Sequence, residues 1–458
     1  MKAVEEFYNH SPLWFQNQMV SLYGVFWQWL RFGGGFNEHC RQISERDNYS
    51  LPQWHEYQHQ RLLQLLKICS EEVPFYREHW NPRIKQSASE GDLAAIPLLE
   101  KKLIRGAETL FVREGHGGIF RQTFKTSGTT GTPISTTFTL SEIRESMALR
   151  EVRSANWAGV SFTQPRATFS GRIIEPNPDE TRHVYRYNSA EKQVYFSAYH
   201  LNPSTARHYV DAIRKHKVVW MTGYAVSFYL LARHILEQKI DVPPLKAIIT
   251  TSEKLTSEMR IVMERAYGCR VFEEYSTVES ALFASECERG HLHVCPDAGI
   301  VEILRPDGTA CEPGEVGEVV ATCLFRTYQP LIRFRLGDLA AWDPDPCPCG
   351  RPMPVIKEVV GRIEDVVTGP DGRQLVRFHG IFTDQPNIVE GQIIQETLTD
   401  FIVKIVATEN FTENDEQDLR QRMVQRLGKD VNVTVQKVGL ILRTKAGKFQ
   451  AVISKVNR

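Results

Sequence analysis

The chain has 458 residues, long enough for two or three domains with a large buried core. Lys plus Arg total 55 and Asp plus Glu total 55, so the formal net charge is zero and no overall field attracts nucleic acid or an anionic lipid surface. Hydrophobic residues make up 42% and charged residues 24%, as is typical of globular proteins. These values argue against a nucleic-acid-binding or intrinsically disordered protein.

The first 120 residues are expected to be largely helical. In the segment QRLLQLLKICSEEV, apolar residues recur at helical spacing and the pattern stops near Pro74. The N-terminal sequence MKAVEEFYNHSPLW lacks the basic segment and apolar run of a signal peptide, so we expect a cytoplasmic protein.

An aromatic passage at residues 19–36 is the one stretch that resembles a membrane segment. It carries Gln28, Arg31 and three consecutive glycines, so a packed helix is favoured over a transmembrane helix. A peripheral membrane contact through its aromatic side chains stays open as an alternative. Those side chains are Phe26, Trp27 and Trp29.

From about residue 125, helical patterns alternate with short β-branched runs, which predicts a parallel sheet with helices on both faces. After Asp297, strand-like runs are separated by Pro-Asp-Gly and Pro-Gly turns, which predicts an antiparallel extension. The expected helices are 141–156, 204–216, 226–238 and 257–267, and the expected strands are 217–221, 245–251 and 270–274.

The C-terminal part has a different pattern. Residues 402–407 and 431–435 alternate like strands around a helix that Thr412 or Asn414 caps and that ends before Gly428. The sequence therefore predicts an α/β protein with a large domain at residues 1–361 and a small α+β domain at residues 362–458.

The segment KTSGTTGTP contains two glycines and several hydroxyl side chains. Glycines allow backbone N–H groups to turn inward, and hydroxyl groups add further donors, so such a loop can bind a polyphosphate. It has neither Walker A nor dinucleotide-binding spacing, and an ordinary flexible turn is the alternative. The candidate phosphate-binding residues are Ser127, Gly128, Thr129, Thr130 and Gly131.

Six of the nine cysteines fall between residues 287 and 349, which suits a reducing compartment and a local metal site better than a disulfide framework. Tetrahedral zinc prefers thiolate and imidazole ligands, and four protein ligands make such a site structural. His291 and Cys295 are competing ligands, and an unmetallated loop is the alternative. The candidate ligands are Cys287, His293, Cys347 and Cys349.

Five motifs in order give the chain a resemblance to a known family: KTSGTTGTP, EEYSTVES, RFRLGDL, GRIED and RTKAGKF. The sequence resembles the adenylate-forming superfamily of acyl- and aryl-CoA synthetases, in its phenylacetate-CoA ligase-like branch. Its C-terminal style GPDGR, QIIQE and GKFQAVISKV is most similar to the sub-branch associated with capsule and exopolysaccharide functions. The resemblance implies a large adenylate-forming domain of mixed sheets flanked by helices, followed by a mobile α+β lid.

The resemblance also implies roles for individual residues. Lys448 corresponds to the lysine that bridges carboxylate and phosphate, Glu279 to the acid that holds Mg²⁺, and Asp338 to the ribose-binding carboxylate. Arg362 and Glu364 correspond to the interdomain hinge. The implied nucleotide-binding residues, beyond the glycine-rich loop, are Thr251, Ser252, Glu253, Tyr275, Ser276, Thr277, Asp338 and Arg362, and the implied substrate pocket is Gly223, Tyr224 and Ala225.

The sequence departs from the family pattern at four positions. Ser276 and Val278 replace the usual Gly and Thr of the second motif quoted, so Thr277 is the candidate for the missing hydroxyl contact with the α-phosphate. Glu364 replaces the usual hinge Asp, and Ile134 follows the glycine-rich loop where Lys or Arg is common.

Two classes of function follow. The first is an acid-thiol ligase that forms an acyl-adenylate from ATP and a carboxylic acid and transfers the acyl group to coenzyme A; a variant uses an amine acceptor in polysaccharide or secondary-metabolite biosynthesis. The second is a non-catalytic scaffold that keeps the fold. Retention of Glu279, Asp338 and Lys448 favours catalysis, with ATP, Mg²⁺, coenzyme A and structural Zn²⁺ as expected cofactors or co-substrates. The branch also suggests a homodimer.

Overall fold

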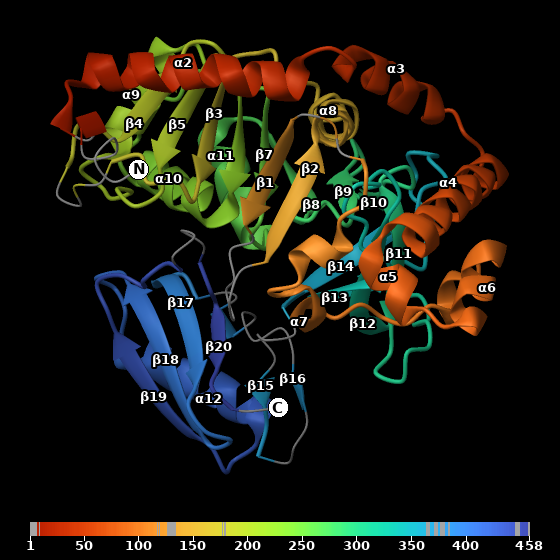
Figure 1. Ribbon diagram of the computed structural model, residues 1–458. Coiled ribbons are helices and arrows are strands. Elements are labelled where there is room, and N and C mark those ends of the chain that lie inside the picture. The colour runs from red at the N-terminus through yellow and green to blue at the C-terminus, as the bar shows by residue number, and fades with distance from the viewer. Residues whose placement is uncertain are drawn as a thin grey trace.

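The computed structural model describes residues 7–8, 10–116, 118, 120–125, 134–175, 177, 180–362, 367–370, 374–375, 381–382, 385–444 and 449–456. It has a large N-terminal domain and a smaller C-terminal unit, shown in blue below the larger domain in Figure 1. The predicted mixed α/β fold is confirmed.

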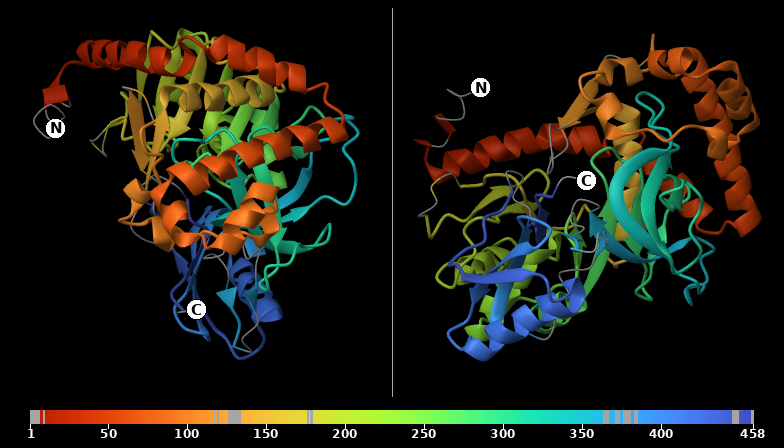
Figure 2. Two further views of the ribbon diagram at one scale, coloured as in Figure 1. Left: turned by 45° about the vertical axis from the view of Figure 1, so that its right-hand side comes forward. Right: turned by 90° about the horizontal axis from the view of Figure 1, so that it is seen from below.

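The N-terminal part is helical, as predicted. Helix α4 begins after Ser50, whose backbone N–H donates to the Gln53 side chain at 2.9 Å in a capping box. Helices α4 to α6 lie at the end of the domain remote from α9 and α10 (Figures 1 and 2). The helices are α2 (Leu13–Phe32), α3 (Phe36–Arg46), α4 (Leu51–Glu72), α5 (Pro74–His79), α6 (Pro82–Glu90) and α7 (Lys101–Ile104).

Helix α2 packs through one aromatic side and exposes the other. Trp27 is buried and lies against Phe124, whereas Phe26 and Trp29 contact Phe120 of the same neighbouring segment. Trp29 is still 47% exposed. Among the residues that the structure describes, no helix is long and apolar enough to cross a membrane. The peripheral membrane contact stays a prediction.

A twelve-stranded sheet forms the centre of the N-terminal domain, in the order β11-β12-β13-β14-β10-β9-β8-β7-β6-β3-β5-β4. Strands β5, β3, β6, β7 and β8 are parallel, and the strands from β9 to β14 pair antiparallel. The antiparallel half therefore begins at Phe283, earlier than the change of pattern after Asp297 predicts, because the chain turns back after β8 to pair β9 against it. The parallel half and its edge strand comprise β3 (Arg166–Ser170), β4 (Tyr185–Asn188), β5 (Gln193–Ser197), β6 (Trp220–Tyr224), β7 (Ala247–Thr251) and β8 (Arg270–Ser276).

The remaining elements of this domain complete the layers. Helix α10 follows β6 directly, and α11 follows β7 after a short loop; Thr256 caps the N-terminus of α11. The antiparallel strands are β9 (Phe283–Glu286), β10 (Leu292–Val294), β11 (Gly299–Leu304), β12 (Val316–Cys323), β13 (Phe334–Trp342) and β14 (Val355–Arg362), with a hairpin of β1 (Arg121–Lys125) and β2 (Ser135–Thr139). The helices are α8 (Leu140–Leu149), continued by a π-helix at Arg150–Ala155, α9 (Ala206–Lys215), α10 (Ala225–Glu237) and α11 (Ser257–Tyr267).

The strand predicted at residues 217–221 begins later than expected, at Trp220. Lys217 has a left-handed backbone with φ of 50° and ends the turn after α9. The Val219 N–H already bonds to Pro165 O at 2.8 Å, which leads the chain into register with β3. The β-branched residues at 218 and 219 therefore approach the sheet before the strand itself begins.

The C-terminal unit has its own four-stranded sheet, in the order β19-β18-β17-β20. Its buried core includes Ile393, Val403, Leu419 and Met423 and is separate from the cores of the N-terminal domain. Strand β14 ends at Arg362, one residue beyond the predicted domain limit at 361/362, and that limit stays a prediction. The elements are β15 (Val367–Thr368), β16 (Gln374–Leu375), β17 (Ile388–Gln395), β18 (Asp400–Ala407), α12 (Glu413–Leu427), β19 (Asn432–Lys437) and β20 (Val452–Ser454).

Candidate functional site

A cavity of about 1340 Å³ lies where the carboxyl ends of β7 and β8 face the C-terminal unit. Parallel strands align their carboxyl ends at one edge, which is where open α/β sheets bind ligands. The N-terminal domain contributes the residues after β7, residues 273–279 and the β13–β14 region, and the C-terminal unit contributes residues 388–391 and 449–452. The lining also includes Lys101, so the cavity joins segments that lie up to about 350 residues apart in the sequence.

Asp338 lies at the centre of a polar cluster in this cavity. Its Oδ2 accepts a hydrogen bond from the Tyr275 hydroxyl at 2.7 Å, and its Oδ1 lies 2.9 Å from Nε of Arg362. Asp338 and Arg362 are register partners on β13 and β14. Burial, followed by the Asp338 charge, holds the pKa of Tyr275 well above its usual value, so this hydroxyl stays a proton donor. The structure thus brings together three predicted nucleotide-binding residues.

Glu279 faces a cation that the sequence analysis did not select. Its carboxylate Oε1 is 3.5 Å from the Lys101 ammonium, and the Glu279 side chain is only 7% exposed. The Glu279 carbonyl accepts a hydrogen bond from the buried Arg326 at 2.6 Å, which fixes the backbone at this point. One buried carboxylate opening on a cavity fits Mg²⁺, which usually takes one or two protein carboxylates and completes its shell with phosphate and water.

The polar side chains at the end of β8 and in the turn after it form hydrogen bonds with nearby residues. Ser276 Oγ donates to Glu274 Oε1 at 3.1 Å, and Thr277 Oγ1 accepts the N–H of Ala281 at 3.2 Å. Val278 is 44% exposed. Ser276, Thr277 and Val278 all line the cavity. The two residues that depart from the family motif, Ser276 and Val278, therefore still lie at the candidate site. The contact of Thr277 with an α-phosphate stays a prediction.

Thr251, Ser252 and Glu253 also line the cavity. Ser252 has φ of 70°, in the left-handed region, where the chain turns sharply away from β7. Glu253 Oε2 accepts the N–H of Val226 at 2.9 Å, and its Oε1 accepts the N–H of Phe449 at 2.9 Å. Glu253 therefore contacts both the first turn of α10 and the C-terminal unit.

The residues predicted to form the substrate pocket, Gly223, Tyr224 and Ala225, have packing roles in the structure. Gly223 has φ of 139°, and a Cβ at this position would lie 1.9 Å from the carbonyl oxygen of Phe169 on β3. A glycine is thus required for close strand packing. Tyr224 and Ala225 are buried, and the cavity lining begins one residue later, at Val226. A substrate role for Gly223, Tyr224 and Ala225 stays a prediction.

Several predicted site residues lie outside the described residues. They are Ser127, Gly128, Thr129, Thr130 and Gly131 of the glycine-rich loop, Glu364 of the hinge and Lys448. Their flanking residues are described: Lys125 ends β1, Arg362 ends β14, and Phe449 lines the cavity.

The sequence analysis missed Lys101, Tyr229 and Phe449 as cavity residues. Lys101 is one of two adjacent lysines in a largely helical region, and Tyr229 lies in an apolar helix, so neither pattern indicates a ligand. Phe449 directly follows Lys448, and this adjacency was the one available signal. Only the folded chain brings these residues to one cavity.

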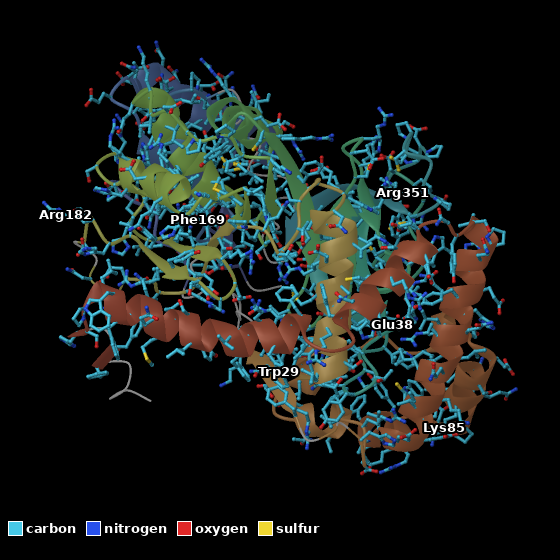
Figure 3. All side chains as sticks on the ribbon, turned by 90° about the horizontal axis from the view of Figure 1, so that it is seen from above. Trp29, Glu38, Lys85, Phe169, Arg182 and Arg351 are labelled. Carbon is cyan, nitrogen blue, oxygen red and sulfur yellow. The ribbon has the colours of Figure 1, made fainter. Side chains whose placement is uncertain are left out.

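A second cluster lies beside the antiparallel strands. The ligand atoms of Cys287, His293, Cys347 and Cys349 all lie within 4.8 Å of one another. Cys287 Sγ is 3.6 Å from Cys347 Sγ, and Cys349 Sγ is 3.3 Å from His293 Nε2. Arg351, two residues after Cys349, is labelled in Figure 3 away from Phe169 of β3. His293 lies on β10, so the cluster lies beside the antiparallel half of the sheet.

The surroundings of the cluster suit a metal. His293 Nδ1 is 3.3 Å from the Met353 carbonyl, so an Nδ1–H donor directs Nε2 toward the thiols. Burial is the main cause that lowers the pKa of His293 to about 4, which keeps its imidazole neutral. Backbone N–H groups of Arg289 and Cys349 donate to the sulfurs of Cys287 and Cys347, at 3.3 and 3.4 Å. Three thiols and one imidazole, from the loop after β9, strand β10 and the loop after β13, fit tetrahedral zinc.

The two alternative ligands have other partners in the structure. His291 Nδ1 lies 3.8 Å from the Asp343 carboxylate, and buried Cys295 lies beside the guanidinium of Arg153. Neither belongs to the described four-residue cluster. The geometry thus favours the four named ligands.

Comparisons with known proteins agree with this architecture. Residues 369–455 match the family of the CapK C-terminal domain. The chain is 24% identical to Protein CapK of Staphylococcus aureus over 463 aligned residues. This alignment covers 98% of this chain and 99% of that protein. A phenylacetate-coenzyme A ligase of Thermus thermophilus is 24% identical over 245 residues, 46% of this chain and 54% of that enzyme.

The solved structure of a 2-hydroxyisobutyryl-CoA ligase in the postadenylation state shows the same fold. Its TM-score is 0.66 at 21% identity, and the match covers 87% of this chain and 89% of that one. The chain is therefore similar to Protein CapK over nearly its full length and shares the fold of a CoA ligase, so the resemblance inferred from the five motifs is confirmed.

Proposed function

We propose that this CapK-like protein activates a carboxylic acid with ATP as an acyl-adenylate, releases pyrophosphate, and transfers the acyl group to coenzyme A. The observation that carries the proposal is the cavity in which Asp338, Tyr275, Arg362 and Glu279 face the C-terminal segment at Phe449. Asp338 would accept the ribose hydroxyls, as the family motif implies.

The chemistry explains why cations must gather here. The oxygen of an anionic carboxylate attacks the α-phosphorus of ATP, so the approach of two anions needs positive charge at the reacting centre. Lys448 would supply an ammonium between them, and the hydroxyl and N–H groups of residues 127–131 would bind the phosphates. Glu279 would hold Mg²⁺, which neutralises charge on the phosphates. Arg362 and Glu364 would act as the hinge that removes the lysine before transfer.

Acid-dependent exchange of labelled pyrophosphate into ATP tests the first half-reaction. A panel of carboxylic acids should contain one that supports exchange by the wild type, and Lys448→Ala should lower the rate by about 100-fold or more, because a charge contact in the transition state is lost. Lys455→Ala, which removes an ammonium paired with Glu396 in the same unit, is the matched control and should exchange normally. Equal rates for both variants would remove Lys448 from the reaction.

The acceptor is tested on the same panel with coenzyme A or amines. A thioester and an amide both form from the same acyl-adenylate, so product analysis decides between them. An amide product would suit a role in polysaccharide biosynthesis. Absence of pyrophosphate exchange with every acid would instead support the scaffold alternative.

We also propose that Cys287, His293, Cys347 and Cys349 bind one structural Zn²⁺. Four protein donors leave no position for a reacting water, so the ion would fix the loops after β9 and β13 and take no part in the reaction.

A further inference from the structure

We propose that Glu253 is a positioning residue that holds the segment around Phe449 against the N-terminal domain during adenylation. This inference rests on the proposed function, because it assigns to Glu253 the placement of Lys448, the residue that precedes Phe449. The Glu253 carboxylate would act through the backbone of the C-terminal unit.

The carboxylate of Glu253 bridges two N–H groups from different domains. Oε2 accepts from Val226 at 2.9 Å, and Oε1 accepts from Phe449 at 2.9 Å. Hydrogen bonds from N–H groups to an ionised carboxylate are stronger than those between neutral groups. One side chain therefore connects the sheet edge to the C-terminal unit.

The N-terminal-domain side of this bridge is rigid. Val226 lies in the first turn of α10, where unpaired N–H groups and the helix dipole stabilise a negative charge. Glu253 itself follows the left-handed Ser252 at the end of β7, whose Thr251 pairs with Tyr224 on β6. The position of the carboxylate is thus set by the parallel sheet.

The other side of the bridge is fixed within the C-terminal unit. The guanidinium of Arg443 lies over the Phe449 ring, 4.9 Å from its centroid. Arg443 is in turn paired with Glu390 on β17, and both side chains are largely buried. A bond to the Phe449 N–H therefore locates Phe449 and the part of the C-terminal unit that contacts it.

The bond between Glu253 and Phe449 should affect adenylation and the transfer half-reaction differently. Under the proposed function Lys448 acts in adenylation and is withdrawn before transfer, which requires the C-terminal unit to move, and such a movement would break the bond between Glu253 and Phe449. Glu253→Gln leaves one carbonyl oxygen for two N–H donors and places an amide N–H₂ near one of them. We expect adenylation to slow while transfer from a preformed acyl-adenylate to the acceptor is retained.

The kinetic experiment is a double-mutant cycle on the full-length protein. Glu253→Gln should lower the maximal rate of acid-dependent pyrophosphate exchange by about 10-fold or more. In the Lys448→Ala background the same change should lower the residual rate by less than about 2-fold, because Glu253 acts through Lys448. Equal fold-losses in both backgrounds, or a rise in the KM for ATP with an unchanged maximal rate, would overturn the proposal.

Hydrogen-deuterium exchange of the Phe449 amide, read at residue resolution, tests the bridge without any activity. Glu253→Gln should accelerate exchange at Phe449 by about 10-fold or more, while β20 amides, which pair with β17, keep their protection. Glu396→Gln is the control, since Glu396 pairs with Lys455 within the C-terminal unit and should leave Phe449 unchanged. Unaltered Phe449 exchange in Glu253→Gln overturns the bridge.

These two measurements separate the two proposals. If no acid supports pyrophosphate exchange but Glu253→Gln still exposes the Phe449 amide, the adenylation proposal fails, and with it the role assigned to Glu253, while the contact stands. If the wild type is active and Phe449 is unaffected, only the positioning role fails.

Discussion

Glu273 is the cavity residue for which the surroundings have the clearest effect on charge. Burial, followed by the negative charge of Glu286, raises the pKa of Glu273 to about 7, although Arg260 and Lys254 oppose the shift. The backbone N–H of Glu273 also donates to the Glu286 carboxylate at 2.9 Å, which holds the Glu286 charge beside this residue. The protonated form of Glu273 is therefore favoured in the folded protein.

This shift predicts a pH-dependent stability. The folded pKa is about 7 and the ordinary value 4.5, so the contribution of Glu273 is fully present below about pH 4.5 and is lost as pH rises through 7. Glu273→Gln removes that loss. Between pH 5 and 8 its stability relative to wild type should rise by up to about 3 kcal/mol, measured by urea unfolding followed by tryptophan fluorescence. A difference that does not change with pH would contradict the assignment.

Asp338 shows that a sequence motif can select a site residue but does not predict its partner. The motif RFRLGDL selected Asp338, and the separate hinge motif GRIED selected Arg362, but neither motif indicates that the two side chains meet at 2.9 Å. The pairing arises because β13 and β14 are antiparallel neighbours. Strand register brings the two motifs together, and register depends on the whole sheet.

At the element scale, the two turns that carry Cys287 and Cys347 have the strongest dependence on a ligand. Each turn has an N–H···S bond and a glycine with positive φ, Gly290 at 85° and Gly350 at 81°. Such turns direct the thiolates toward one point, where their negative charges repel one another. A bound cation would remove that repulsion.

We therefore expect the purified protein to contain about one zinc per chain, measured by inductively coupled plasma mass spectrometry. Cys347→Ser should lose the metal and lower the free energy of unfolding by about 2 kcal/mol or more, and a strong chelator should have a similar effect on the wild type. Cys40→Ser changes a cysteine outside the cluster and should keep the metal. A metal-free wild type with unchanged stability in Cys347→Ser would disprove the site.

At the scale of the whole molecule, the two domains have separate hydrophobic cores. The core around Ile393 and Met423 belongs to the C-terminal unit, whereas the large cores lie between residues 62 and 356. A cooperative transition requires a shared core, so the two parts are expected to unfold independently to some extent.

Tryptophan positions make this prediction measurable. All eight tryptophans lie at or before Trp342, so their fluorescence reports the N-terminal domain, whereas far-ultraviolet circular dichroism reports both parts. In urea, the two signals should give different midpoints, and circular dichroism should show an additional transition. Superimposable curves would indicate that the interdomain contacts make the protein unfold as one unit.

The sequence by itself determined the α/β class, the separate C-terminal unit, the helix at 257–267, the adenylate-forming resemblance and the four cysteine and histidine ligand candidates, because periodicity and motif chemistry are local. The tertiary structure alone decided that Lys101 faces Glu279, that Gly223 is required by the backbone of β3, and that Glu253 reaches Phe449. These contacts join residues that are far apart in the chain. Their existence depends on sheet order and domain placement, which no local pattern encodes.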